Sequence, residues 1–497
     1  MSNKFYPKNI VNYVLFSKYQ KTVLDNYTIF AITILYYSMK REIIQSFIEW
    51  KNRNDRCPLI LRGARQVGKT YVVEEFARSE FKNLLKINLE EKPELKKLFR
   101  DNDVKRILAE LSILMNIDVH FGETLFFIDE IQSCPECIRS LRYFKEITPG
   151  LHVICAGSLL DHALSEYNIS MPVGRVEFMY LHPMNFKEFL RAVNQDKLVS
   201  YMEGYEFSTS FSEVIHYQIA KYLRFYFFIG GMPAVVKSFA ENEELSAIQR
   251  IQNNILSSFQ YDFAKYGTRK QQEFLQMVLK YCGRFPGRKI RYLNIDKEVR
   301  STYLKEAILK LALSRIIHIV KHTNSSVIPL SEHVKNDIYK TFFLDIGFVN
   351  QLNQIDLTGL ENLITANEGM LAEQFIAQEL VCIQPEYISP EIFYWSREEK
   401  NSNAEIDFIF QHRNRIYPVE VKAGKTGSLK SMQVYLHEKK LTQGIRFNMD
   451  VPSTGEFNTK MNQLEKNGEL SWKLLSLPLY MVSELKRLLD AGVFGNQ

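Results

Sequence analysis

Residues 59–70 read Leu-Ile-Leu-Arg-Gly-Ala-Arg-Gln-Val-Gly-Lys-Thr. An apolar run ends at Gly63, and Gly68, Lys69 and Thr70 open a segment with a helical pattern. The spacing Gly-x-x-x-x-Gly-Lys-Thr is that of a loop that wraps a phosphate between a strand and a helix. The glycines let the backbone curl so that several N–H groups face one anion, and the helix adds its positive amino end. The stretch therefore predicts an α/β fold with a nucleotide site.

Two side chains of this loop have the chemistry that a nucleotide needs. Lys69 is long enough to reach the β- and γ-phosphates, and the Thr70 hydroxyl is a ligand suited to Mg²⁺. We therefore expect ATP and Mg²⁺ as ligands of residues 63–70, which are Gly63, Ala64, Arg65, Gln66, Val67, Gly68, Lys69 and Thr70.

Composition limits the remaining possibilities. A chain of 497 residues is expected to hold two to four domains. The net charge of +6 is only mildly basic, so any nucleic-acid site must be a local patch. Six scattered cysteines favour a reducing, cytoplasmic setting. Cys134 and Cys137 form one C-x-x-C, for which we expect ordinary thiols, with a redox or metal role as the alternative.

Strands and helices alternate downstream of the loop. Strands are expected at 84–89, 125–128 and 151–156, and helices at 69–79 and 94–118. The second of these strands ends at Asp129 and Glu130. In an ATPase Asp129 would hold the magnesium shell and Glu130 would polarise the attacking water. Ser158 follows the third strand, where it would sense the γ-phosphate.

The amino-terminal residues 1–38 differ from the rest. They are rich in Tyr, Asn, Ile and Lys, and their apolar run at 27–37 is too short to span a bilayer. An amphipathic helix begins just after Met39. We therefore expect the working domain to start near Met39, with 1–38 as a mis-called start or a loose anchor.

The motifs together resemble a large prokaryotic family with an AAA-type ATPase domain, over residues 39–190. The resemblance includes Gly174-Arg175, the segment 181–186, and Gly230-Gly231-Met232-Pro233 beyond the domain. It implies an extra strand between the phosphate-loop strand and the Glu130 strand, and a catalytic Glu130. It also makes Arg175 a candidate arginine finger or sensor; the alternative is a surface salt bridge.

The middle of the chain is expected to be helical. Residues 191–267 read as a helical connector, with an aromatic core helix at 215–229. Residues 268–332 suggest a winged helix, with helices at 274–282 and 302–313 and a wing from 316–320 and 327–330. The loop 284–291 is a basic patch with one aromatic residue. DNA binding and protein contact are equally open for this segment.

The last segment, 333–497, carries a second group of polar residues. The alternation of a strand places Glu420 and Lys422 on one face, and the turn at 411–415 would bring Asp407 beside Glu420. With Glu373 upstream, the set resembles the PD-(D/E)-x-K nuclease-like domain that follows such ATPases, and it implies a metal held by Asp407 and Glu420. The alternative is an inactive nuclease fold that serves in binding.

Two function classes remain open. One is an Mg²⁺-dependent ATPase coupled to a DNA-binding or nuclease-like carboxyl-terminal domain. The other is a nucleotide-dependent switch that binds a partner through an inactive tail. DNA and a second copy of the chain are candidate partners, and a membrane is not favoured.

Overall fold

The computed structural model describes residues 39–158, 160, 171–242, 245–354, 360–397, 404–423, 429–460 and 469–495. Contacts divide the chain into Met1–Met39 and Lys40–Gln497, and every element below belongs to the second unit. The predicted extension 1–38 lies outside the described residues.

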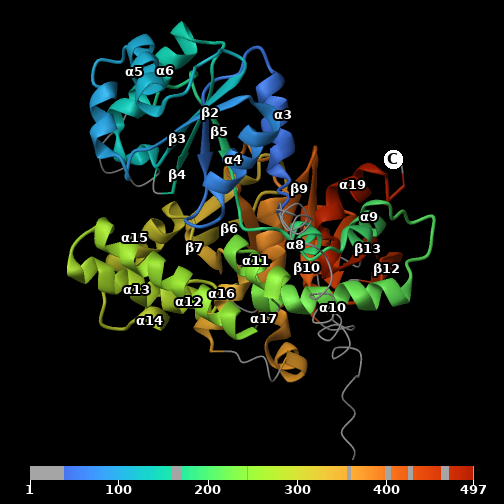
Figure 1. Ribbon diagram of the computed structural model, residues 1–497. Helices are drawn as coiled ribbons and strands as arrows, with labels where there is room; N and C mark the ends of the chain where they lie inside the picture. Colours follow the sequence, from blue (N-terminus) through green and yellow to red (C-terminus); the bar gives the residue numbers. More distant parts are fainter. Residues whose placement is uncertain are drawn as a thin grey trace, which may run out of the picture. The chain divides into compact units, whose positions relative to one another are not determined.

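A five-stranded parallel sheet forms the first layer of the fold (Figure 1). Its order is β2-β3-β4-β1-β5, with β1 Leu59–Arg62, β2 Asn83–Asn88, β3 Thr124–Asp129, β4 His152–Gly157 and β5 Glu177–Tyr180. Strands β3 and β4 are buried on both faces, which explains their continuous apolar sequence. Strand β4 lies between β1 and β3, so the extra strand implied by the family resemblance is present.

Helices cover both faces of this sheet. The helices are α3 Ile43–Asn52, α4 Lys69–Glu80, α5 Val104–Met115 and α6 Pro135–Ile147, with 3-10 turns η1 Pro93–Phe99 and η2 Ile131–Ser133. The single helix expected over 94–118 is wrong. The chain turns at Asn102, which has a φ of 59°, and the Asp103 carboxylate then caps α5 by accepting from the Arg106 N–H. Helical spacing of leucines alone did not reveal this break.

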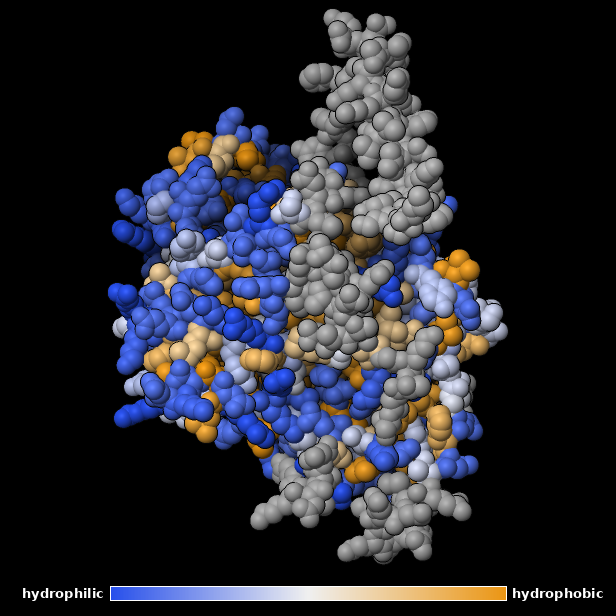
Figure 2. Space-filling view, turned by 90° about the horizontal axis from the view of Figure 1, so that it is seen from below, coloured by the Kyte–Doolittle hydropathy of each residue, from blue (hydrophilic) through white to orange (hydrophobic). Residues whose placement is uncertain are grey.

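Helices dominate the segment between the sheets, as expected for 191–267. They are α8 Phe186–Ala192, α9 Asp196–Glu203, α10 Glu213–Ile229, α11 Pro233–Asn242, α12 Leu245–Asp262, α13 Arg269–Arg284, α14 Tyr292–Ile295 and α15 Ser301–Leu313, with η3 Phe263–Tyr266. Helix α10 buries its aromatic carboxyl half and stops at Gly230, whose φ is 75°. No helix among the described residues is long and apolar enough to cross a membrane. Hydrophilic side chains cover most of the face shown in Figure 2, and apolar ones gather in small patches.

A mixed eight-stranded sheet forms the second layer, in the order β12-β13-β11-β10-β9-β8-β6-β7. Its strands are β6 Ile317–Thr323, β7 Val334–Phe343, β8 Ile392–Ser396, β9 Glu405–His412, β10 Arg415–Val421, β11 Gln443–Asn448, β12 Ser453–Lys460 and β13 Glu469–Pro478. The flanking helices are α16 Ile346–Leu352, α17 Leu360–Cys382, α18 Lys430–Lys439 and α19 Leu485–Asp490, with η4 Leu330–His333 and η6 Leu479–Glu484.

The wing expected from 316–320 and 327–330 is wrong in its second strand. Strand β6 pairs instead with β7, and residues 327–330 form no strand. Pro329 has no N–H to give to a ladder, which disfavours a strand there. Strand β6 also pairs with β8 in parallel, so it joins the predicted winged-helix segment to the carboxyl-terminal strands in one sheet.

A buried carboxylate ties the helical segment to the second sheet. Asp345 caps α16 by accepting from the Gly347 N–H at 2.9 Å, and it also accepts from the Gly231 N–H. A Cβ on Gly230 would lie 1.8 Å from Asp345 Oδ1, so a side chain at this position would displace the Asp345 carboxylate. This contact places Gly230 and Gly231, part of the family resemblance, against the start of α16.

Candidate functional site

The phosphate loop, residues 63–70, leaves the carboxyl end of β1 and enters α4 as predicted. Gln66 and Gly68 both have left-handed backbones, with φ of 65° and 93°. A Cβ on Gly63 would lie 2.3 Å from the Leu181 carbonyl oxygen. Glycine is therefore required at 63 by close packing and favoured at 68 by conformation.

Lys69 is buried inside the curl of this loop. Its ammonium donates to the carbonyl oxygens of Gly63 at 3.0 Å and Ala64 at 2.8 Å. Burial lowers the pKa of Lys69 to about 8, although the carboxylates of Glu130 and Asp129 partly offset this effect. Lys69 is therefore positioned by the loop itself, with both acids close enough to act on its charge.

The first sheet brings Thr70, Asp129, Glu130 and Ser158 to the same edge, because β1, β3 and β4 run parallel. The Thr70 hydroxyl donates to Asp129 Oδ2 at 2.8 Å. These two oxygens are hard ligands of the kind Mg²⁺ prefers, so the residues present fit that ion.

Glu130 follows β3 in a left-handed conformation, with a φ of 53°. Its carboxylate is half-buried and accepts from the Gln132 amide. A Cβ on Gly157, the residue before Ser158, would lie 2.4 Å from Gln132 Oε1. Gln132 therefore lies between the Glu130 carboxylate and the end of β4, a contact that the sequence did not suggest.

The structure does not bring Arg175 to the phosphate loop of its own chain. Glu177 pairs with Leu59 in the parallel register of β5 and β1, so Arg175 precedes the amino edge of the sheet. The loop follows the carboxyl edge. Arg175 Nε instead lies 2.9 Å from Glu146 Oε1, the surface salt bridge named above as its alternative. A role of Arg175 at a nucleotide would require a second copy of the chain.

Two other arginines lie in or near the loop: Arg65, which the motif includes, and Arg315, which no sequence pattern singled out. Arg65, inside the motif, forms an ion pair with Asp262 at the end of α12, and Gln66 donates to the Ser258 hydroxyl at 2.9 Å. The Arg315 guanidinium lies 4.6 Å from the ring centroid of Tyr180, the residue that pairs with Arg62 beside the loop. Asp262 and Arg315 are far from the motif in sequence, so only the fold reveals these contacts.

The hairpin of β9 and β10 brings Asp407 and Glu420 together as predicted. The antiparallel register pairs Phe408 with Val419, and the Val421 N–H donates to Asp407 Oδ2 at 2.8 Å. The Lys422 ammonium pairs with Glu420 Oε1, so these two side chains share one face. Burial and the Asp407 carboxylate raise the pKa of Glu420 to about 7.

Glu373 from α17 joins this group. Burial and the Asp407 charge raise the pKa of Glu373 to about 8, and burial also raises the pKa of Asp407. The negative charge of Glu405 also raises the pKa of Asp407, and no pattern in the sequence points to Glu405. We call Glu373, Glu405, Asp407 and Glu420 the carboxylate cluster.

Lysines offset part of this negative charge. Lys340 of β7 is 2% exposed and forms an ion pair with Glu405, and Lys289 reaches the same carboxylate at 2.7 Å. Burial alone would lower the pKa of Lys340, but the surrounding carboxylates, first Glu405, raise it above its usual value. No periodicity in the sequence links Lys289 or Lys340 to the hairpin.

One oxygen of the cluster is left without a partner. Glu420 is 4% exposed, and its Oε2 is buried with no hydrogen-bond partner among the described residues. Within the same residues, no three His, Cys, Asp or Glu side chains form a preassembled metal cage. Mg²⁺ commonly uses one or two carboxylates and keeps several waters, so Asp407 and Glu420 still fit such an ion.

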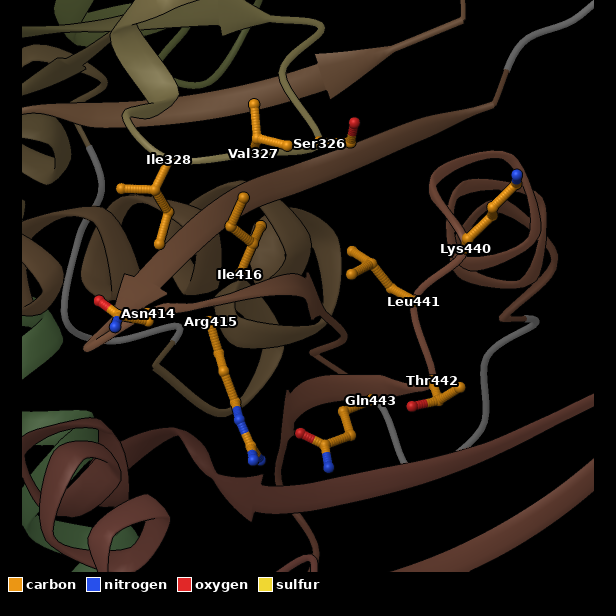
Figure 3. A pocket seen from close by; sticks show the side chains of 10 residues that line it. All are labelled: Ser326, Val327, Ile328, Asn414, Arg415, Ile416, Lys440, Leu441, Thr442 and Gln443. Atoms are coloured by element: carbon orange, nitrogen blue, oxygen red, sulfur yellow. The ribbon is translucent and has the colours of Figure 1, made fainter. Parts of the chain in front are cut away.

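A separate pocket of about 500 Å³ lies at the opposite end of the same hairpin. Its lining includes Asn414 and Arg415 at the turn, whereas Asp407 and Glu420 are at the far ends of the two strands. Figure 3 shows Ile328, Ile416 and Leu441 around the pocket, with Lys440 pointing away from them. The pocket is not part of either candidate site.

The remaining motif is the Cys134-Cys137 pair. Both thiols are buried at the start of α6, and burial raises the pKa of each above its usual value. Both are free. Thiols in this state are poor nucleophiles and poor ligands, in line with the expectation of ordinary core residues.

The parallel sheet and its loop define an α/β P-loop NTPase domain, and the comparisons with known proteins agree with that class. The family model of an AAA domain matches residues 55–190. Two models described as domains of unknown function match residues 220–359 (DUF8612) and 368–480 (DUF4143). The chain therefore carries an AAA-type P-loop domain followed by a carboxyl-terminal DUF4143 domain. A comparison with curated proteins found no match.

Solved structures give only distant likenesses. The structure of the Aeropyrum pernix ORC2 protein in ADPNP-ADP complexes matches at 10% identity and a TM-score of 0.30, covering 63% of this chain and 90% of that chain. The Thermotoga maritima RuvB Holliday junction branch migration motor matches at 13% identity and a TM-score of 0.28, covering 60% and 92%.

Proposed function

We propose that the chain binds ATP with Mg²⁺ at the phosphate loop and hydrolyses it. The observation that carries this proposal is the Thr70–Asp129 hydrogen bond of 2.8 Å beside the buried ammonium of Lys69. A magnesium ion held by Thr70 and Asp129 would neutralise charge on the phosphates. Lys69 binds the β- and γ-phosphates, and the half-buried Glu130 carboxylate orients the attacking water.

Calorimetric titration of ATP tests the binding step. Lys69→Ala leaves phosphate charge unpaired, so ATP affinity should fall by about tenfold or more. Lys82→Ala is the matched control, because Lys82 is an exposed lysine of the same domain that pairs with Glu123. Equal ATP affinity in all three proteins would contradict the assignment.

A second candidate function rests on the carboxylate cluster. The orphaned Glu420 Oε2, beside Asp407 and the Lys422–Glu420 pair, favours a divalent cation there. Such an ion would act as a Lewis acid on a phosphodiester, with Lys422 stabilising charge on the phosphate. The alternative is that this nuclease-like tail is inactive and the ATP state of the chain controls its binding to a partner.

Cleavage and turnover assays separate these two functions. The enzyme class predicts Mn²⁺-dependent nicking of DNA that is lost in Asp407→Ala, and ATP turnover that changes when DNA is added. The switch class predicts no cleavage and a partner affinity that differs between the ATP and ADP states. We also propose domain boundaries near residues 39, 191, 268 and 333, with β6 of the third segment contributing to the sheet of the last one. A homo-oligomeric assembly and a cytoplasmic location belong to the same proposal.

A further inference from the structure

The loop of residues 284–291, here the rim loop, is fastened along the edge strand β7. The Gly287 N–H donates to the Thr341 carbonyl oxygen and the Ile290 N–H to the Tyr339 carbonyl oxygen, each at 2.9 Å. Lys289 and Lys340 form an antiparallel bridge between these two contacts. The rim loop joins α13 to α14, so a segment outside the predicted nuclease-like region is paired with that region's sheet.

The rim loop borders the carboxylate cluster directly. Lys289 Nζ lies 2.7 Å from Glu405 Oε2. A Cβ on Gly287, whose φ is 76°, would lie 2.9 Å from Glu373 Oε2. The backbone of the rim loop at Gly287 therefore approaches the Glu373 carboxylate, and the Lys289 ammonium neutralises the Glu405 carboxylate.

The three arginines of the rim loop are exposed. Arg284, Arg288 and Arg291 form no ion pair with any carboxylate of the described residues, and Arg288 lies 4.8 Å from the ring centroid of Phe285. Among the four basic residues of the rim loop, only Lys289 directs its side chain towards the carboxylate cluster. The loop thus presents three guanidinium groups to solvent beside a cluster of acids.

We propose that the rim loop binds the phosphate backbone of a nucleic-acid strand and places it across the carboxylate cluster. This inference rests on the proposed second function, because the cluster is the site that the strand would reach. Carboxylates alone repel phosphate, whereas guanidinium groups bind it through paired, charge-assisted hydrogen bonds. The lysines at Glu405 and Glu420 reduce the repulsion where the backbone crosses.

The test compares two triple variants with the same change in charge. The rim variant combines Arg284→Ala, Arg288→Ala and Arg291→Ala. The control combines Arg100→Ala, Lys105→Ala and Arg139→Ala, which are exposed positions of the AAA-type domain. Binding of a short fluorescein-labelled DNA duplex is followed by anisotropy over a range of salt, in EDTA and without nucleotide. Failure of metal binding, cleavage or ATP turnover therefore does not affect the readout.

We expect the rim variant to bind DNA about tenfold more weakly or worse. The slope of log affinity against log salt should fall by about 2 to 3, at roughly 0.9 per lost phosphate contact. The control should stay within about twofold of wild type, and both variants should keep the wild-type melting temperature. The proposal is overturned if wild type does not bind DNA, if both variants lose binding equally, or if wild type binds polyglutamate as well as DNA.

Discussion

Replacing Glu379 by glutamine should change how the stability of this protein depends on pH. Glu379 lies on α17 and is fully buried. Its Oε1 accepts from the Phe186 N–H at 2.9 Å, while its Oε2 has no partner among the described residues. Burial raises the pKa of Glu379 to about 8, because an ionised carboxylate at this place would lack solvation.

The sign and size of the effect follow from linkage. The pKa in the folded protein exceeds the ordinary value of 4.5. The folded state therefore holds the proton more tightly than the unfolded chain. The contribution to stability is complete below about 4.5 and is lost as pH rises through about 8, at roughly 1.4 kcal/mol per pH unit. Across that window the loss is on the order of a few kcal/mol, and the neutral amide introduced by Glu379→Gln cannot ionise.

Urea unfolding from about pH 5 to about pH 9 measures this effect. Wild type should lose stability across the range, and Glu379→Gln should lose distinctly less. Glu332→Gln, which changes an exposed carboxylate, is the control and should follow wild type. Burial also raises the pKa of Asp345 to about 7, so its ionisation lowers the stability of wild type and of Glu379→Gln alike as pH rises. Identical pH slopes in wild type and Glu379→Gln would refute the assignment of a buried, protonated acid.

Four further substitutions test separate parts of the structure. Gly63→Ala puts a Cβ 2.3 Å from the Leu181 carbonyl oxygen, so the loop must shift and ATP affinity should fall by about tenfold or more in calorimetry. Arg315→Ala should weaken ATP binding more than ADP binding, whereas Arg175→Ala should leave both affinities of the monomer within about twofold of wild type. Asp407→Asn should abolish Mn²⁺ binding to the carboxylate cluster with the melting temperature retained. Unchanged binding in any of the variants expected to weaken it contradicts the role of that residue.

Short-range features of the molecule could be predicted from the sequence. Glycine at 68 is favoured by the local left-handed backbone of the phosphate loop, and the spacing of the motif identifies both the strand before it and the helix after it. The packing of Gly63 against the Leu181 carbonyl oxygen is a long-range contact that only the fold reveals. The hairpin of β9 and β10 could also be predicted, because the turn at 411–415 and the alternation of residues around Glu420 set the register of its two strands. Asp129 and Ser158 lie at one edge because parallel strands end on the same side.

The long-range features could not be predicted. Arg175 was assigned by resemblance, but its position depends on the register of β5 against β1, which no local pattern encodes. The burial of Lys340 cannot be predicted from its sequence context, because a lysine in an edge strand is usually solvated. Here it is buried against Glu405. The same holds for the Arg65–Asp262 ion pair, which joins residues 197 positions apart in the chain.

The most direct test of the central claim is a paired measurement of ATP binding and ATP turnover in Glu130→Gln. The substitution keeps the shape of the side chain but removes the charge that orients water. We expect ATP affinity within about threefold of wild type and turnover reduced by about a hundredfold or more. Loss of ATP binding in this variant, or turnover equal to that of wild type, would contradict the account of this site as an ATPase centre.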